Sequence, residues 1–303
     1  MSDFLVRARQ ILSDSSLLLN EPLSLHSSFR IGGEADYFAK PESEEAFTAL
    51  LSAAGECGVP YCVIGCASNI LFSDKGFRGV VISTLGLKNI DINGNLVRAG
   101  AGVTMPVLSS RAQKNSLDGM RFMCGIPGTV GGGVFMKAGA YGGEIACILT
   151  SSRYYDTEKG EIFSLSASEH DFGYRHSSYM EHNERVLLSA DFSLTLGNPD
   201  EIKAECEELL RRRAEKQPLE FPSAGSTFKR PEGYFAGKLI QDAGLSGYKV
   251  GGAMVSTKHA GFVINAGGAT AQDIYQLIQH IQKTVNDKFQ VELEPEVRFL
   301  GEF

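Results

Sequence analysis

Glycine is unevenly distributed along this chain, and its distribution limits the folds open to it. Residues 119–143 contain nine glycines and residues 225–268 contain ten, so these two stretches hold 19 of the 34 glycines in 303 residues. Neither stretch favours a long helix, because glycine destabilises a helix interior by about 1 kcal/mol. Two interpretations remain open. Glycine supplies positive φ in turns between short strands, or it lets bare backbone N–H groups approach a ligand.

Composition and charge exclude several classes of protein. The hydrophobic share of 43% excludes a disordered chain, and 10 prolines without a G-x-y period exclude a collagen-like repeat. The formal net charge of −7 gives no basic field for nucleic acid. Asp3, Arg7 and Arg9 interrupt any signal-peptide core, and no apolar run is long enough to span a bilayer. The length predicts about two domains and no membrane insertion.

The cysteines indicate a reducing compartment. They form no C-x-x-C pair and no ligand spacing with histidine, so we expect buried reduced thiols, a cytoplasmic protein and no structural metal. The six are Cys57, Cys62, Cys66, Cys124, Cys147 and Cys206.

Hydrophobic periodicity predicts a mixed α and β chain. Helices are expected over 41–57, from 199 to just before Pro218, and over 271–287, where Thr270 is the N-cap and Asp273 its partner. The middle helix is expected to bury Ile202, Cys206, Leu209 and Leu210. Strands are expected over 61–65, 79–83, 153–156, 186–196 and 290–299, with a hairpin over 90–103 turning at Asn93-Gly94. The turn-forming residues Gly197-Asn-Pro199 predict a domain boundary there.

Three side chains are candidates for chemistry, each with a plainer alternative. In the expected strand 290–299, Glu292, Glu294 and Glu296 fall on the polar face, which solvent alone explains for the first two. Pro295 removes a ladder hydrogen bond, and a carboxylate directly after such a break, Glu296, is a candidate for a cleft. Ser226 would need a general base to act as a nucleophile, and neither a base nor a nucleophile elbow is nearby, so its plainer interpretation is a turn serine bonding the backbone. Arg175 either pairs with a local carboxylate or clamps a substrate carboxylate.

Standard nucleotide motifs are missing. The sequence has neither G-x-G-x-x-G nor G-x-x-x-x-G-K-[ST], so a Rossmann fingerprint and a P-loop are excluded. A phosphate-bearing ligand would need another cradle. Lys229 and Arg230, just after Ser226, either hold a phosphate or are simply exposed.

Seven short motifs follow one another along the chain: Ser28–Gly33, Gly65–Asn69, Gly125–Gly132, Ala138–Gly142, Phe172–Arg175, Ala224–Phe228 and Leu293–Arg298. Together they resemble the UDP-N-acetylenolpyruvoylglucosamine reductase family of bacterial peptidoglycan precursor synthesis. The resemblance runs from about His26 to Gly301. The chain lacks a long insertion between Arg175 and Ile202, so it resembles the shorter type of this enzyme, without the tyrosine-bearing loop.

The resemblance implies an α+β fold. An FAD-binding domain of the vanillyl-alcohol-oxidase (PCMH) type is expected over 1–197, in two lobes of about 1–85 and 86–197, followed by an α/β substrate-binding domain over 198–303. FAD would be bound non-covalently, with NADPH as reductant. The residues implied for FAD are Arg30, Gly65, Cys66, Ala67, Ser68, Asn69, Gly125, Ile126, Pro127, Gly128, Thr129, Gly132, Gly139, Ala140, Tyr141 and Arg298.

Three positions depart from the family pattern. Cys66 and Ala67 stand in a loop that is usually glycine-rich, and Ala67 would be strained if its φ is positive. Lys137 stands where asparagine is common and Gly133 where alanine is common. We expect neither Lys137 nor Gly133 to touch the chemistry directly.

The resemblance also assigns roles. UDP-N-acetylglucosamine enolpyruvate would accept hydride from the flavin and a proton from Ser226, while Arg175 and Glu296 stabilise the enolate-like charge. Glu296 would act protonated, which burial favours. Candidates for substrate contacts are Tyr174, Arg213, Lys216, Lys229 and Arg230. The protein is expected to be monomeric. The rival interpretations are another flavin oxidoreductase of the same fold and a non-catalytic nucleotide-sugar binding protein.

Overall fold

The computed structural model describes residues 3–303, in which helices and short strands alternate. The α-helices are α1 (Asp3–Ile11), α2 (Glu44–Glu56), α3 (Met105–Lys114), α4 (Val130–Phe135), α5 (Pro199–Lys216), α6 (Ala236–Asp242) and α7 (Ala271–Phe289). Short 3-10 helices separate several strands and include η3 (Arg121–Met123), η5 (Ala167–His170) and η6 (Ser178–Met180).

The strands form three larger sheets and three pairs. A four-stranded sheet has the order β1 (Leu17–Pro22), β2 (Glu34–Ala39), β5 (Phe77–Ser83), β3 (Tyr61–Ile64). A five-stranded antiparallel sheet has the order β12 (Glu161–Ser166), β11 (Leu149–Asp156), β13 (Arg185–Ser193), β7 (Leu96–Gly100), β6 (Ile90–Asn93). The third is β15 (Lys249–Val250), β16 (Ala253–Val255), β17 (Val263–Asn265). The pairs are β4 (Ile70–Phe72) with β18 (Arg298–Leu300), β9 (Gly139–Ala140) with β10 (Gly143–Glu144), and β8 (Leu117–Asp118) with β14 (Thr195–Leu196).

Two compact units share the chain in alternating segments. Unit 1 holds Met1–Leu19, Tyr37–Cys66 and Gly79–Arg212, and unit 2 holds Asn20–Asp36, Ala67–Arg78 and Arg213–Phe303. The chain therefore changes unit inside β1, β2, β5 and α5 and within the loop after β3. Because the units interleave along the chain, they do not test a boundary at 197–198 between consecutive domains. That boundary stays a prediction.

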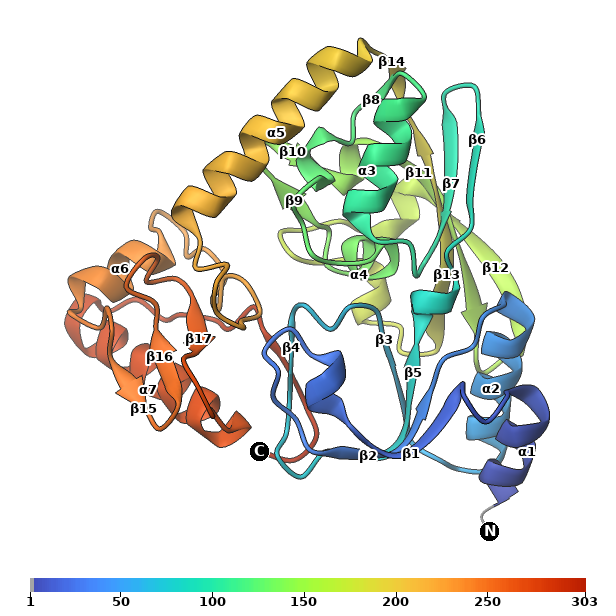
Figure 1. Cartoon of the computed structure of the whole chain (residues 1–303), viewed down its shortest axis with the longest axis horizontal. Helices are drawn as coiled ribbons and strands as arrows, with labels where there is room; N and C mark the ends of the chain where they lie inside the picture. The colour runs from blue at the N-terminus through green and yellow to red at the C-terminus, as the bar shows by residue number, and fades with distance from the viewer. Residues whose placement is uncertain (1–2) are drawn as a thin grey trace. The chain divides into compact units, whose positions relative to one another are not determined.

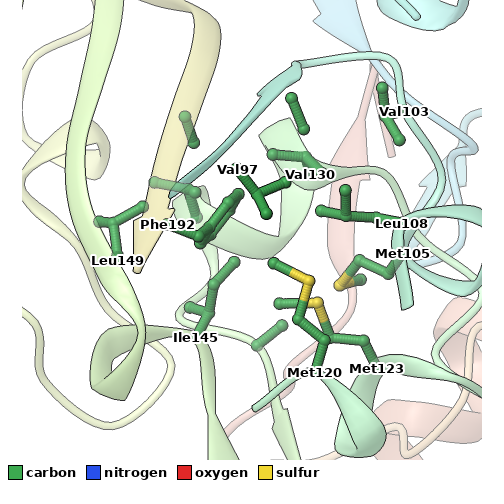
Figure 2. Close-up of a cluster of buried hydrophobic side chains, with 14 of the residues drawn as sticks. Val97, Val103, Met105, Leu108, Met120, Met123, Val130, Ile145, Leu149 and Phe192 are labelled. Atoms are coloured by element: carbon green, nitrogen blue, oxygen red, sulfur yellow. The ribbon is translucent and has the colours of Figure 1, made fainter. Parts of the chain in front are cut away.

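Unit 1 is built around the five-stranded sheet. Helices α3 and α4 pack on one of its faces (Figure 1), where apolar residues of β7, β11 and β13 meet them in one buried cluster. Figure 2 shows Met105, Met120 and Met123 within this cluster, beside Phe192 of β13. Flexible methionine side chains fill irregular space of this kind well.

The neighbouring residues of the same strands face a second cluster. Tyr154 and Leu187 belong to the first cluster, whereas Tyr155, Val186 and Leu188 pack with α1 and α2 in the second. This follows from the two-residue period of a strand, which sends successive side chains to opposite faces. The sheet is thus covered on both faces over these residues.

Unit 2 packs its longest helix against its short sheet. Apolar residues of α7, among them Ile274, Leu277 and Ile281, are buried with Ala253, Val255 and Val263 of β16 and β17. Figure 1 shows α7, α6 and these strands close together. The same cluster takes Leu71 of β4 and Leu293 and Val297 of the C-terminal segment.

Most predicted elements are confirmed with shifted ends. Helix 271–287 is α7, the hairpin at Asn93-Gly94 joins β6 to β7 with Asn93 opposite Leu96, and the strands at 61–65, 79–83 and 153–156 are β3, β5 and part of β11. The helix from 199 is α5, but Leu210 is 44% exposed, so its predicted burial is wrong. The cysteines are free thiols as expected, yet they are half-buried, with Cys147 exposed, rather than fully buried.

The predicted strand 290–299 is wrong for most of its length. Only Arg298–Leu300 forms a strand, with one isolated bridge at Pro295. Proline has no N–H to give to a ladder, and the bridge is made instead by the N–H groups of Lys229 and Glu296 on either side. The predicted alternation of faces nevertheless holds, because Leu293 and Val297 are buried while Glu292 and Glu294 are exposed.

Residues 3–303 contain no helix that is both long and apolar enough to cross a membrane.

Two sets of hydrogen bonds cap the N-terminus of α7 within unit 2. The Asp74 carboxylate accepts from the N–H groups of Ala271 and Gln272, at 2.8 and 3.0 Å. Thr270 and Asp273 form the predicted capping box.

The capping box makes stability depend on pH. Backbone N–H groups of Thr270 and Gly252 donate to Asp273 and hold the pKa of its carboxyl below the usual 3.8. The ionised form is therefore favoured in the folded state, so its contribution is present above pH 4 and lost as pH falls through the folded-state pKa. We expect Asp273→Asn to lower the free energy of unfolding by about 1 kcal/mol at pH 7.

Urea unfolding at pH 7 and at pH 3 measures this difference, which should shrink at the lower pH. Asp287→Asn, an exposed position on the same helix outside the cap, is the control and should not destabilise. An Asp273→Asn protein as stable as the original at pH 7 would contradict the prediction.

Candidate active site

Ser226 and Glu296 lie on two segments of unit 2 that pair through their backbones. The N–H of Glu296 donates to the carbonyl of Thr227 at 2.8 Å, and the N–H of Lys229 donates to the carbonyl of Glu294 at 2.8 Å. Phe228 and Pro295 form the bridge between these two bonds. Ser226 is next to Thr227, so the fold brings the two predicted residues into neighbouring positions.

Ser226 is presented on a short, fixed piece of backbone. Gly225 before it has φ 77°, in the left-handed region, and Thr227 after it is buried. The Thr227 hydroxyl accepts from the N–H of Val263 at 2.9 Å, and its own N–H donates to the carbonyl of Gly261 at 2.9 Å. Ser226 itself is exposed. The buried threonine therefore anchors the exposed serine.

Glu296 is held on its other side by the end of the Gly65–Asn69 loop. The Asn69 side-chain amide donates to the carbonyl of Glu296 at 2.9 Å, and the N–H of Arg298 donates to the carbonyl of Asn69 at 3.0 Å. Parallel pairing of β4 with β18 continues this contact. Unlike Glu292 and Glu294, Glu296 is half-buried. The structure thus joins Asn69, Glu296 and Arg298.

The Ser28–Gly33 segment of unit 2 meets the same loop. The Ser28 hydroxyl donates to the carbonyl of Ala67 at 3.4 Å. Arg30 has φ 55°, and the carbonyl of Phe29 before it accepts from the Asn265 side chain at 3.1 Å. Two predicted FAD residues, Arg30 and Ala67, therefore belong to segments that contact each other.

Arg175 lies in unit 1, in a tight turn closed by the bridge between Gly173 and His176. Its φ is 54°, and its Nη1 donates to the carbonyl of Lys137 at 3.5 Å. Lys137 therefore contacts a candidate catalytic side chain, and the expectation that it does not touch the chemistry directly stays a prediction. The contact uses the backbone carbonyl, while the Lys137 ammonium pairs with Glu144 at 2.9 Å.

The two glycine-containing loops of unit 1 touch each other. A Cβ on Gly65 would lie 2.2 Å from Oγ1 and 2.8 Å from Cγ2 of Thr129, too close for any side chain. The Thr129 hydroxyl also accepts from the N–H of Gly132 at the start of α4. Gly65 is thus required by close packing rather than by a turn. The remaining predicted residues of this loop are Gly125, Ile126, Pro127 and Gly128.

Strained backbone is concentrated at predicted site positions. Among residues 3–303, nine non-glycine residues have positive φ. Four of them, Arg30, Ala67, Tyr141 and Arg175, are predicted site residues, and a fifth, Lys137, contacts Arg175. A left-handed conformation costs such residues about 1 kcal/mol or more, and it gathers at functional sites. The predicted strain at Ala67 is confirmed by its φ of 45°. Asparagine adopts this conformation more readily than lysine, which makes position 137 notable.

The other candidates are placed as follows. Gly139 and Ala140 pair with Glu144 and Gly143 in the β9–β10 hairpin, and Tyr141 lies in its turn. Tyr174 is exposed, and the Cζ atom of Arg175 lies 5.4 Å from the centroid of its ring. Lys229 pairs with Glu294 at 2.6 Å, and the Arg230 guanidinium lies 4.0 Å from the Phe235 ring centroid. Arg213 and Lys216 lie in the last turn of α5, where cations also stabilise the helix dipole.

Burial raises the pKa of the Cys66 thiol, which favours its protonated form. Cys66 and Ser68 lie on either side of Ala67, where the chain leaves unit 1 and enters unit 2. The contact between Lys137 and Arg175 was not predictable, because a backbone carbonyl carries no sequence signature.

Two family models match the chain. An FAD binding domain matches residues 35–166, and the C-terminal domain of UDP-N-acetylenolpyruvoylglucosamine reductase matches residues 217–300. A UDP-N-acetylenolpyruvoylglucosamine reductase of Caldanaerobacter subterraneus subsp. tengcongensis is 46% identical over 303 residues, covering 100% of both chains. One of Lachnoclostridium phytofermentans is 49% identical over 299 residues, covering 97% of this chain and 96% of the relative.

Comparison with solved structures gives the same family and shows the fold. The crystal structure of UDP-N-acetylenolpyruvylglucosamine reductase from Thermus caldophilus has a TM-score of 0.79 and 31% identity, covering 94% of this chain and 98% of that chain. A glucose dehydrogenase has a TM-score of 0.51 and 15% identity over 65% of this chain and 44% of that chain, which shows the fold alone. The predicted α+β fold with an FAD-binding domain of the vanillyl-alcohol-oxidase type is confirmed.

The contact between Gly65 and Thr129 generates a prediction. Gly65→Ala should lower the free energy of unfolding by about 1–3 kcal/mol, because the new methyl group overlaps Thr129. Adding Thr129→Ala removes Oγ1 and Cγ2 and should relieve much of this loss, so the two changes should be strongly non-additive. Thermal unfolding of the two single variants and the double variant measures the coupling.

Gly55→Ala is the matched control, because a Cβ on this α2 residue meets nothing within 4 Å. It should be neutral or stabilising, as helix propensity favours alanine over glycine. Additive effects of Gly65→Ala and Thr129→Ala would show that the two loops are not packed as described.

Proposed function

The chain belongs to the UDP-N-acetylenolpyruvoylglucosamine reductase family, and from this premise we propose that it reduces UDP-N-acetylglucosamine enolpyruvate to UDP-N-acetylmuramate with NADPH. This reaction supplies a precursor of bacterial peptidoglycan. The observation that carries the proposal is the backbone pairing that places Ser226 beside Glu296, within a chain that matches these reductases over its whole length.

The residues present fit a non-covalently held FAD. The direct contact of Gly65 with Thr129, where a Cβ would not fit, brings two of the loops assigned to FAD together. Arg30, Ala67 and Tyr141 hold strained backbone conformations of the kind that gather at ligand sites. We assign FAD binding to Arg30, Gly65–Asn69, Gly125–Thr129, Gly132, Gly139–Tyr141 and Arg298. Once reduced by NADPH, the flavin supplies the hydride for the vinyl carbon of the substrate.

Ser226 donates the proton in this proposal. Addition of hydride to the vinyl CH2 leaves an electron pair on the neighbouring carbon, and one proton from the Ser226 hydroxyl completes the reduction. An acid needs no adjacent base to activate it, so the absence of a nucleophile elbow in the sequence is consistent with this role. The exposed Ser226 on the anchored Thr227 backbone supports it.

Arg175 and Glu296 stabilise the charge that develops on the substrate. As the carbanion forms, negative charge spreads onto the substrate carboxylate, where a fixed guanidinium and a protonated carboxyl donate hydrogen bonds. The Arg175 guanidinium is oriented by the Lys137 carbonyl, and Glu296 is fixed through its backbone by Thr227 and Asn69. Preorganised donors of this kind lose little energy in reorganising.

Basic side chains would bind the substrate diphosphate. Arg230 is exposed, its guanidinium lies on the Phe235 ring, and its Nε donates to the Tyr234 carbonyl. Lys229 is partly neutralised by Glu294. We propose both as contacts of the substrate, together with Tyr174, Arg213 and Lys216. The protein is proposed to act as a monomer in the bacterial cytoplasm.

The function predicts a specific spectroscopic sequence. Purified protein should show a flavin absorbance band that bleaches with NADPH and recovers, without oxygen, when UDP-N-acetylglucosamine enolpyruvate is added. Stopped-flow absorbance measures both steps. Flavin that stays with acid-precipitated protein would favour an oxidase with covalent flavin. Protein that binds the UDP-sugar but never holds flavin would favour the binding-protein alternative.

Ser226→Ala should separate the two steps. Flavin reduction by NADPH should proceed at the original rate, while reoxidation by the enolpyruvyl substrate falls by about 10²–10⁴-fold, the usual contribution of a positioned acid. Ser223→Ala, three residues earlier in the same segment, is the matched control and should leave both rates unchanged, since its bridge to Ile264 uses the backbone. Normal steady-state turnover of Ser226→Ala would refute the serine assignment.

A further inference from the structure

A buried polar network joins both ends of the segment that carries Arg175. This segment, residues 171–178, is called the Arg175 segment. It lies between His170, at the end of η5, and Tyr179, in η6. The side chains of both residues meet one hydroxyl group. The Ser152 Oγ of β11 lies 2.8 Å from Nε2 of His170 and 2.7 Å from the hydroxyl oxygen of Tyr179.

The three side chains are isolated from solvent. His170 and Ser152 have no exposed surface, and Tyr179 is 3% exposed. The hydrogen bond between Ser152 and His170 resembles the serine–histidine pair of a catalytic triad, but no substrate can reach these buried side chains. They therefore do not form a second catalytic centre. Three polar groups buried together need a reason, because leaving any of them unpaired costs about 1–3 kcal/mol.

Hydrogen-bond chemistry gives the network one direction. The His170 Nδ1 lies 2.8 Å from the carbonyl of Ser166, which can only accept, so Nδ1 carries the proton. Burial lowers the pKa of His170, so the ring is neutral and Nε2 accepts from the Ser152 hydroxyl. Ser152 in turn accepts from the Tyr179 hydroxyl, whose pKa burial raises. Each polar side-chain atom of Ser152, His170 and Tyr179 has a hydrogen-bond partner in this arrangement.

The Arg175 segment needs such support because its backbone is strained. Asp171 and Arg175 both have positive φ, 45° and 54°. Within the segment, Phe172 stacks on the His170 ring with 5.0 Å between centroids, and the Ser177 hydroxyl donates to the carbonyl of Phe135 at 2.7 Å. Conformations of this kind persist only where surrounding contacts fix them.

We infer that His170 is a positioning residue: through Ser152 and Tyr179 it fixes the Arg175 segment so that the guanidinium is held ready for the substrate carboxylate. The inference rests on the proposed function for Arg175. It assigns to His170, a residue that touches no ligand, the task of holding the catalytic arginine. All four residues belong to unit 1.

Tyr179→Phe and His170→Gln test the inference at different severity. Tyr179→Phe removes one hydroxyl and keeps the packed ring, so it should fold even if His170→Gln does not. In Tyr179→Phe, reoxidation of the flavin by the enolpyruvyl substrate should slow by roughly three- to tenfold, in line with the loss of one buried hydrogen bond. Flavin reduction by NADPH should be unchanged.

A readout independent of catalysis accompanies the rates. Amide hydrogen exchange in residues 171–178 should speed up by about the same factor, with exchange in β11 and β13 unaltered. Tyr155→Phe is the matched control, since Tyr155 lies on β11 beside Tyr154 but packs with the other cluster. It should change neither the rates nor the exchange of this segment.

A double-variant cycle distinguishes positioning from general stabilisation. In an Arg175→Ala background, Tyr179→Phe should slow reoxidation no further, because the group that it positions is gone. Rates and exchange equal to those of the original protein in Tyr179→Phe would overturn the inference. So would equal losses in both half-reactions, which a merely structural role predicts. If the original protein shows no reoxidation by the substrate while exchange in 171–178 still responds, the proposed function fails and the network stands.

Discussion

The candidate site of unit 2 depends on one backbone hydrogen bond, from the N–H of Glu296 to the carbonyl of Thr227. It joins two segments about 70 residues apart in sequence and sets the relative positions of Ser226 and Glu296. The anchoring of Thr227 on Val263 and of Glu296 on Asn69 extends this bond into the β16–β17 and β4–β18 pairs. Backbone bonds of this kind do not depend on side-chain identity, so the site residues remain free to serve chemistry.

A second constraint is steric. Gly65 packs where no Cβ fits, and Arg30, Ala67, Lys137, Tyr141 and Arg175 hold left-handed backbone without being glycine. Each such residue costs free energy that packing elsewhere must offset. In unit 1 the offset comes from the covered sheet and from buried bonds such as the one between Ser177 and Phe135. Four of these residues, Arg30, Ala67, Tyr141 and Arg175, are ones that we propose to bind FAD or substrate, and backbone strain is expected at preorganised sites.

Sequence reasoning succeeded where the signal is local. The apolar stripe of α7 and its Thr270–Asp273 box lie within one helix, and both were predictable. The prediction of a strand over 290–299 was wrong because the alternation of Leu293 and Val297 reports burial alone. A strand also needs a paired neighbour, and here pairing is limited to the bridge at Pro295 and to Arg298–Leu300. The roles of Ser226, Glu296 and Arg175 came from resemblance, since residues so distant in sequence share no local pattern. The network of Ser152, His170 and Tyr179 was not predictable, because only the tertiary fold brings those side chains together.

Lys137 shows how such a site tolerates change. The resemblance leads to an expectation of asparagine here, which suits positive φ better, yet the contact with Arg175 is made by the backbone carbonyl. What the position must supply is therefore a carbonyl in the right direction, and any residue that holds the left-handed conformation provides it. The lysine side chain is then available for the pair with Glu144 across the β9–β10 hairpin, which helps to fix the strained backbone. The backbone of Lys137 thus makes the contact with Arg175, while its side chain takes part in a separate ion pair.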